Sequence, residues 1–104
     1  ADHQIKLHGY RIELGDIEAQ LARLDAVDAV VVLPRGPAGA LTHLEAVVRL
    51  ADAEAPRSLT TTLALRRRLG ELLPAYMIPK TFTYVDAFPR TTNGKVDRRA
   101  LEGR

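Results

Sequence analysis

The chain has 104 residues, of which 46% are hydrophobic and 27% are charged. This length suits one domain with a single core, and the composition is ordinary for a globular protein, which excludes disordered and fibrous classes. The formal net charge of +2 is too small to indicate a nucleic-acid or membrane partner. Because the chain has no cysteine, disulfides and thiolate metal sites are also excluded.

Neither a targeting segment nor a membrane span is predicted. The first seven residues are charged and mixed, unlike a signal peptide. The longest apolar stretch, residues 27–34, is interrupted by Asp28 and falls far short of the roughly 20 residues that a membrane-spanning helix needs. We therefore expect a cytoplasmic protein.

The first predicted elements are two short extended pieces and a helix. Between residues 4 and 14, apolar residues alternate imperfectly around Gly9, which indicates a strand, a turn and a second extended piece. From Gly15 onward the spacing becomes helical, with an apolar stripe formed by Ile17, Leu21 and Leu24.

The middle of the chain predicts a hairpin followed by a second helix. Residues 29–33 form a β-branched, apolar run, typical of a central strand that is covered on both faces. Turn residues fill positions 34–39, and residues 41–50 can return as an antiparallel strand. Ser58 can cap a helix that ends at Pro74. To the apolar side of this helix we assign Leu59, Leu63, Leu69, Leu72 and Leu73.

The last predicted strand spans residues 81–85, and Pro89 marks the end of regular pairing before a polar loop, residues 90–94. The resulting order is mostly β-α-β-β-α-β. We therefore predict a small α/β (α+β) fold: a sheet of about three main strands with an antiparallel hairpin, covered by two amphipathic helices.

Most of the candidate sites in the sequence favour plain structural interpretations. His3, His8 and His43 have no acidic partners at metal-ligand spacing, so we expect no metal site. The glycines at 36 and 39 are not followed by the Gly-Lys-Ser/Thr of a phosphate-binding loop. The three arginines at 66–68 point about 100° apart on a helix, which favours a solvated face and leaves a docking contact as the alternative.

The segment around Lys95 is more informative. Asn93 and Gly94 favour a tight turn because both residues tolerate positive φ, and this turn would hold Lys95 exposed at a loop tip. A lysine there is a mobile charge suited to phosphate or carboxylate. Most such lysines are merely solvated, so the pattern alone leaves both interpretations open.

Three segments, in order, resemble motifs of amino-acid-activating adenylation domains. Residues 2–18 (DHQIKLHGYRIELGDIE) resemble the hinge-side motif, residues 73–79 (LPAYMIP) resemble the next one, and residues 93–98 (NGKVDR) resemble the last. Together they span nearly the whole chain. Residues 1–104 are thus identified as the small C-terminal lid subdomain of an adenylate-forming enzyme of the ANL superfamily. The segment KLHGYR, residues 6–11, is most similar to D-alanine–carrier protein ligases and related amino-acid ligases.

This resemblance implies a ligase that acts in two steps, as in nonribosomal peptide synthesis and antibiotic biosynthesis. A carboxylate first attacks the α-phosphate of ATP, which gives an acyl-adenylate and releases pyrophosphate. A phosphopantetheine thiol on a peptidyl or acyl carrier protein then attacks the adenylate to form a thioester. The lid rotates between the steps, so each step uses a different face of it. The contacts to ATP and Mg²⁺ and the substrate pocket belong mainly to the large N-terminal core subdomain. Because this chain lacks that subdomain, we expect it to be inactive alone.

The resemblance also implies site residues. Lys95 would bridge the substrate carboxylate and the α-phosphate of ATP, Asp2 would be the hinge, and Gly9, Tyr10 and Arg11 would form the loop used in the thioester step. The residues also allow structural interpretations. Gly9 can simply permit a turn, and we favour a surface ion pair for Arg11 with Glu13 and core filling for Tyr76 and Met77.

A second function class remains open. The chain could instead be a non-catalytic module that docks a carrier protein through Arg66–Arg68 or through Arg98 and Arg99. The retained Lys95 favours the catalytic lid, because a docking module has no need of a lysine on an Asn-Gly turn.

Overall fold

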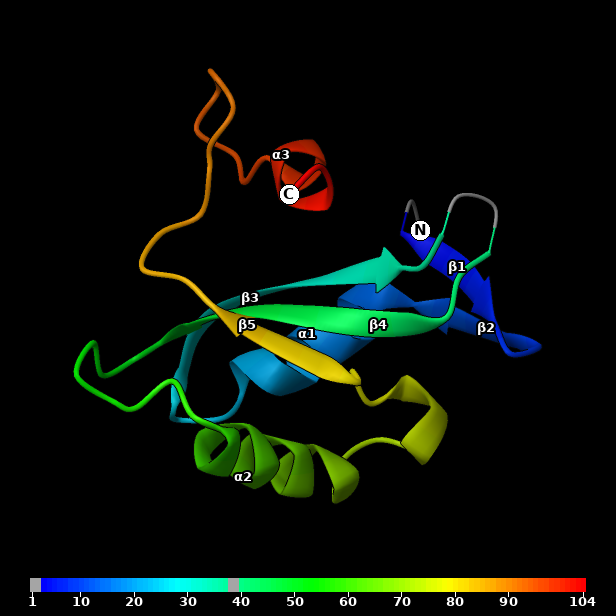
Figure 1. Cartoon of the computed structure of the whole chain (residues 1–104), viewed down its shortest axis with the longest axis horizontal. Helices are drawn as coiled ribbons and strands as arrows, with labels where there is room; N and C mark the ends of the chain where they lie inside the picture. Colours follow the sequence, from blue (N-terminus) through cyan, green and yellow to red (C-terminus); the bar gives the residue numbers. More distant parts are fainter. Residues whose placement is uncertain (1–2, 38–39) are drawn as a thin grey trace.

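A three-stranded sheet forms the centre of the molecule in the computed structural model, which describes residues 3–37 and 40–104 (Figure 1). Its strands, β3 (Val27–Arg35), β4 (His43–Leu50) and β5 (Thr81–Tyr84), lie in the order β3-β4-β5. β3 and β4 form the predicted antiparallel hairpin, and β5 pairs parallel with β4. The prediction that β3 is central is wrong, because β4 lies in the middle and β3 lies at the edge.

A separate antiparallel hairpin, β1 (Gln4–Leu7) and β2 (Tyr10–Glu13), precedes this sheet, as the sequence predicts. His8 and Gly9 both have positive φ angles, 51° and 82°. Two such residues are what the turn of a two-residue hairpin requires. A lone two-stranded hairpin is only marginally stable, and Leu7 and Ile12 attach this one to the core.

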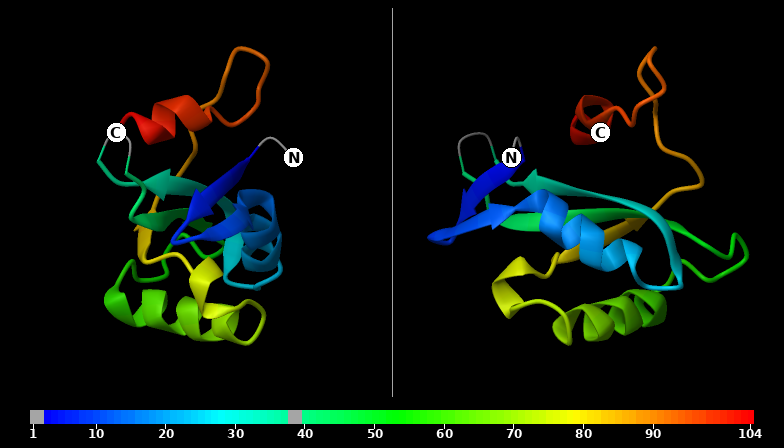
Figure 2. Two further views of the ribbon diagram at one scale, coloured as in Figure 1. Left: turned by 90° about the vertical axis from the view of Figure 1, so that its right-hand side faces the viewer. Right: turned by 180° about the vertical axis from the view of Figure 1, so that it is seen from behind.

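Two helices, α1 (Leu14–Ala22) and α2 (Leu59–Gly70), cover one face of the sheet (Figure 2). The side chain of Ser58 caps α2 as predicted, accepting a hydrogen bond from the Thr61 N–H at 3.3 Å. The core on this face is formed by α1, α2 and the sheet, through Ile17, Leu21, Leu65, Leu69, Val32, Ala46 and Val48. The predicted α+β fold with two amphipathic helices is confirmed.

The apolar side of α2 differs from the prediction. Leu65 and Leu69 are buried, whereas Leu59 and Leu63 are 72% and 52% exposed. Leu63 and Leu65 are two residues apart, so they point about 200° apart around the helix, and only one of the two leucine stripes can face the sheet. The helix also ends at Gly70, before the proline at 74, and a short 3₁₀ helix, η1 (Ala75–Met77), follows.

A third helix, α3 (Arg98–Glu102), covers the other face of the sheet and was not predicted (Figure 1). Its apolar contact places Leu101 with Phe88 against Val31, Leu33 and Val47. The long loop between β5 and α3 projects away from the body of the domain (Figure 1). Among the described residues, no helix is both long enough and apolar enough to cross a bilayer.

Candidate functional site

Lys95 lies in a small, hydrogen-bonded hairpin within the loop between β5 and α3. Arg90 and Val96 form an isolated antiparallel bridge at its base. The N–H of Thr91 donates to the carbonyl of Lys95 at 2.7 Å, and the N–H of Gly94 donates to the carbonyl of Thr91 at 2.9 Å. The tight turn at Gly94, where φ is +82°, is therefore confirmed.

The tip of this hairpin is open to the surroundings. Lys95 is exposed, and a Cβ atom placed on Gly94 would meet nothing within 4 Å. Gly94 is thus needed for its backbone angle and not for a tight internal contact. A cationic side chain on a defined turn, with free space around it, can reach a ligand held by another body.

The other predicted site residues, Gly9, Tyr10 and Arg11, lie at the turn between β1 and β2 and on β2. Arg11 donates from Nε and Nη2 to Gln4 Oε1, at 3.0 and 2.7 Å. A shallow pocket beside the turn is lined by Gln4, Ile5, Lys6, Gly9 and Arg11. The hinge prediction, Asp2, lies outside the described residues.

Two attachments hold the tip of this hairpin to the rest of the domain. The imidazole Nε2 of His8 lies 3.2 Å from the carbonyl oxygen of Thr42. The ring of Tyr10 stacks on that of Tyr76, with centroids 3.9 Å apart and planes inclined by 11°. Tyr76 is 40% exposed, so the interpretation of this residue as core filling is wrong, whereas Met77 does pack against the core.

The structure does not bring Lys95 and the Gly9 turn together. The loop that carries Lys95 projects on the α3 side, whereas the β1–β2 turn lies at the opposite end of the sheet (Figure 1 and the right view of Figure 2). The two candidate sites are therefore separate surfaces of one body.

Arg98, which follows Lys95 closely, is engaged within the domain. Its Nη1 donates to Glu18 Oε2 at 2.8 Å and its Nη2 donates to the Val32 carbonyl at 2.6 Å. The arginines of α2 at positions 66–68 are exposed, and Arg68 pairs with Glu71 at 3.4 Å. Of the two docking surfaces considered from the sequence, the one that includes Arg98 is therefore unsuitable.

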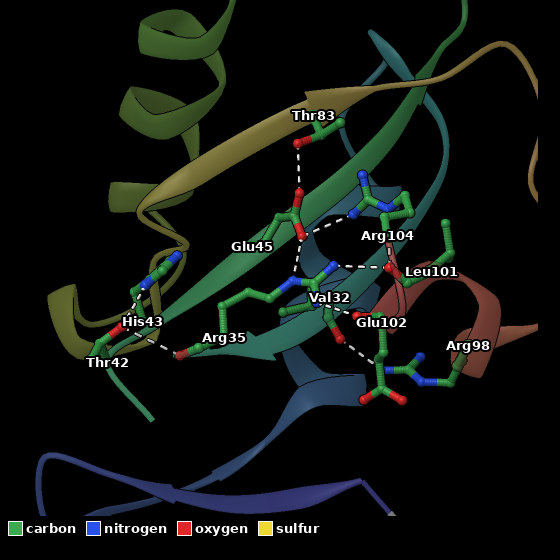
Figure 3. Close-up of polar contacts among 10 residues, drawn as sticks. All are labelled: Val32, Arg35, Thr42, His43, Glu45, Thr83, Arg98, Leu101, Glu102 and Arg104. Atoms are coloured by element: carbon green, nitrogen blue, oxygen red, sulfur yellow. Dashed lines mark hydrogen bonds and ion pairs between the residues drawn. The ribbon is translucent and has the colours of Figure 1, made fainter. Parts of the chain in front are cut away.

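A second polar cluster joins the end of α3 to the sheet (Figure 3). Glu45 accepts hydrogen bonds from Thr83 Oγ1 at 2.5 Å, Arg35 Nε at 2.8 Å and Arg104 Nη2 at 2.9 Å. Arg35 also donates to the carbonyls of Leu101 and Glu102, at 2.8 and 2.7 Å. Burial alone would raise the pKa of Glu45, but these donors outweigh it and hold that pKa below its usual value.

Sequence reasoning missed the Tyr10–Tyr76 stack and the contacts of Glu18, Glu45 and Arg98. Glu18 and Arg98 both stand within the motif segments, but their 80-residue separation gave no sign that they meet. In residues 3–37 and 40–104, no group of three or more His, Asp or Glu side chains is arranged to hold a metal ion.

Residues 16–95 match the family model of the AMP-binding enzyme C-terminal domain. The chain is 43% identical over 101 residues to the D-alanine--D-alanyl carrier protein ligase of Bacillus licheniformis, covering 97% of this chain and 20% of that protein. It is 45% identical over 100 residues to tyrocidine synthase 3 of Brevibacillus parabrevis, covering 96% of this chain and 1% of that protein. The chain thus spans about a fifth of the length of the carrier protein ligase that it matches.

Solved structures agree with these relationships. Klebsiella oxytoca NpsA in complex with 3-hydroxyanthranilyl-AMSN superposes with a TM-score of 0.81 at 29% identity, over 98% of this chain and 19% of that chain. The anthranilate CoA ligase AuaEII in complex with anthranoyl-AMP shares the fold, with a TM-score of 0.84 at 24% identity over 98% of this chain and 20% of that one. The chain belongs to the family of AMP-binding enzyme C-terminal domains, the C-terminal domain of the adenylate-forming ligases of the ANL superfamily.

Proposed function

We propose that residues 1–104 form the mobile lid of an amino-acid-activating ligase and supply its catalytic lysine, Lys95. The lid would work beside a large N-terminal core that binds ATP, Mg²⁺ and the acid, and would then present the acyl-adenylate to the phosphopantetheine of a carrier protein. One observation carries the proposal: Lys95 stands exposed on an ordered Asn-Gly hairpin in a domain of this family.

The chemistry of the first step suits a lysine in this position. Attack of a carboxylate on the α-phosphate of ATP gathers negative charge on both groups. The ammonium group of Lys95 would lie between them and stabilise this charge. A defined hairpin lowers the entropic cost of placing the charge, because the backbone of residues 90–96 is already fixed by its own hydrogen bonds.

The second step would use the other end of the domain. In this proposal Asp2 is the hinge, and Gly9, Tyr10 and Arg11 approach the core after rotation and line the path of the phosphopantetheine thiol. The positive φ of Gly9 and the empty space around it would let a ligand approach the backbone closely. Separate surfaces for the two steps match the separation of the two loops (Figure 1).

The test uses the full-length enzyme that contains this domain. Amino-acid-dependent ATP–pyrophosphate exchange is measured for the wild type and for Lys95→Ala, and thioester formation from supplied adenylate is measured in parallel. Lys80→Ala, which also removes an exposed lysine, is the matched control. We expect Lys95→Ala to lower exchange about a hundredfold or more, equivalent to about 2.7 kcal/mol of transition-state stabilisation, while thioester formation and the control remain normal.

Unchanged exchange in Lys95→Ala would contradict the proposed role of the lysine. A docking module would then be the better interpretation. A reading frame that continues upstream into a large adenylating subdomain would support the lid.

A second candidate function, docking of a carrier protein, is favoured by the outer face of α2. This face exposes Leu59 and Leu63, and a shallow pocket on it is lined by Thr60, Leu63, Ala64, Arg67 and Arg68. Such a surface fits an acidic partner with a small apolar patch. We expect Arg67→Glu to raise the KM for the carrier protein about tenfold with adenylation unchanged, whereas Arg23→Glu, at the C-terminal cap of α1, leaves both normal. An unchanged KM in Arg67→Glu would exclude this surface.

A further inference from the structure

At Val32, the outer edge of β3 is bound by two side chains instead of a neighbouring strand. The N–H of Val32 donates to Glu18 Oε2 at 2.8 Å, and the carbonyl of Val32 accepts from Arg98 Nη2 at 2.6 Å. Glu18 and Arg98 are joined by an ion pair at 2.8 Å. The pair thus satisfies both backbone groups of one residue, as a paired strand would do.

This pair links elements from opposite faces of the sheet. Glu18 belongs to α1, which packs on the same face as α2, and Arg98 is the first residue of α3, which packs on the other face. Figure 3 shows the Arg98 guanidinium directed at the Val32 carbonyl. Both side chains are largely buried, with 22% and 21% of their surfaces exposed, so solvent screens the pair only in part.

Apart from Arg98, the segment that carries Lys95 is held to the sheet by the Glu45 cluster at the far end of α3 and by a small apolar contact. Between β5 and the end of the chain, the apolar contacts to the sheet come from Phe88 and Leu101, with Val85 and Val96 partly buried beside them. A small apolar contact of this kind fixes distance from the sheet but is not directional. Hydrogen bonds are directional. Among those that join this segment to the sheet, the bond from Arg98 is the nearest to Lys95 in sequence, with only Val96 and Asp97 between the two residues.

The connection from Arg98 to Lys95 is short and is fixed by backbone contacts. Asp97 caps α3 by accepting from the Ala100 N–H at 3.1 Å, and its own N–H donates to the Pro89 carbonyl at 2.8 Å. Val96 pairs with Arg90 at the base of the hairpin. A rotation of α3 at Arg98 would therefore be passed to the hairpin as a displacement of Lys95.

We propose that Glu18 and Arg98 are positioning residues for Lys95, which set the direction in which its hairpin projects from the sheet. This inference rests on the proposed adenylation role of Lys95. It assigns the two residues an effect on the first half-reaction alone, because the Gly9 turn lies at the other end of the domain and is held by different contacts.

The test again uses the full-length enzyme, with the conservative variants Arg98→Lys and Glu18→Gln. Lysine at position 98 keeps the positive charge but cannot reproduce the two hydrogen bonds that the guanidinium group donates to Glu18 and the Val32 carbonyl. Glutamine at position 18 keeps an acceptor for the Val32 N–H but not the ion pair. Arg99→Lys, at the exposed next position of α3, is the matched control. Each variant is assayed for exchange, for thioester formation from supplied adenylate and for thermal unfolding.

We expect Arg98→Lys and Glu18→Gln each to lower the kcat of adenylation by about tenfold or more, since displacements of about 1 Å can cost a hundredfold in rate. Thioester formation should stay within about twofold, and the KM for ATP should change little. The decisive measurement is the adenylation rate of the double variant that combines Lys95→Ala with Arg98→Lys. Arg98→Lys should cause no further loss of adenylation in that background.

Three results would overturn the inference. A further loss in the Lys95→Ala background would show that the pair acts independently of the lysine. Equal losses in both half-reactions, together with a lower unfolding temperature, would show a merely structural role. Normal adenylation in both variants would show no role, and if Lys95→Ala nevertheless collapses exchange, the proposed function stands and only this inference fails.

Discussion

Glu45 allows a sharp test of what holds α3 against the sheet. Glu45 is 8% exposed, and its carboxylate accepts three hydrogen bonds, two of them from the guanidinium groups of Arg35 and Arg104. The substitution Glu45→Gln keeps the size of the side chain, removes its charge and turns one acceptor into a donor. Both arginines bind Oε1, so the amide oxygen can still accept from them, while the NH₂ stands in place of Oε2 and can donate to the Thr83 hydroxyl. What the substitution removes is the negative charge between the two guanidinium groups.

The expected cost follows from burial. Removing one partner of a fully buried ion pair costs about 3 to 5 kcal/mol. The side chains of Arg35 and Arg104 are 22% and 36% exposed, so water can replace part of what they lose. We therefore expect Glu45→Gln to lower the free energy of unfolding by about 2 kcal/mol at pH 7, which for a domain of this size lowers Tm by about 10 °C.

The cost should depend on pH with a defined sign. The folded-state pKa of Glu45 lies below its usual value of 4.5. Its ionised form therefore adds stability that is fully present above that usual value and is lost as the pH falls through the lower, folded-state pKa. The gap between the wild type and Glu45→Gln should be constant from pH 6 to 7 and shrink in acid.

Urea unfolding of the 104-residue chain across this pH range measures the gap directly. Glu54→Gln, at an exposed position in the connector after β4, is the control and should stay within about 0.5 kcal/mol of the wild type. If Glu45→Gln unfolds like the control at pH 7, or if its deficit does not shrink in acid, the charge of Glu45 is not what the network depends on.

Three further substitutions test local features. Tyr76→Ala should weaken the stack on Tyr10 by about 1 kcal/mol and speed amide hydrogen exchange in residues 4–13, whereas Tyr76→Phe should not; equal exchange in both would contradict this. Ser58→Ala should remove the cap of α2 and lower the free energy of unfolding by about 1 kcal/mol, measured by thermal unfolding. An unchanged Tm would show that water replaces the cap. Gly94→Ala should cost about 1 kcal/mol because its φ is +82°, and urea unfolding equal to the wild type would show that the turn relaxes freely.

Much of the fold could be predicted because local patterns and packing agree. The hairpin of β3 and β4, the turn at Gly9 and the cap at Ser58 each follow from a few neighbouring residues. The buried face of α2 could not be predicted, because the helix carries leucines on two sides and the position of the sheet decides between them. The apolar run of β3 did indicate coverage on both faces, but coverage of the faces says nothing about the edge.

The candidate site was predictable to a different extent. The exposed turn of Lys95 follows from Gly94, since the preference of glycine for positive φ is local, whereas Asn93 is not among the residues with positive φ. The Tyr10–Tyr76 stack and the Glu18–Arg98 pair join residues that are far apart in sequence. Neither pairing leaves a periodic signal, and the short helix α3 offers too few apolar residues for its face to be recognised.

The edge of β3 also has a consequence for the order of synthesis. Glu18 precedes Val32 by 14 residues in the sequence, but Arg98 follows Val32 by 66 residues. While the chain emerges from the ribosome, the carbonyl of Val32 stays unpaired on an apolar strand until the last motif has been made. An open strand edge of this kind pairs readily with other chains. This edge of the nascent domain therefore stays open to pairing between completion of the β3–β4 hairpin and arrival of α3, and Arg98 ends that interval.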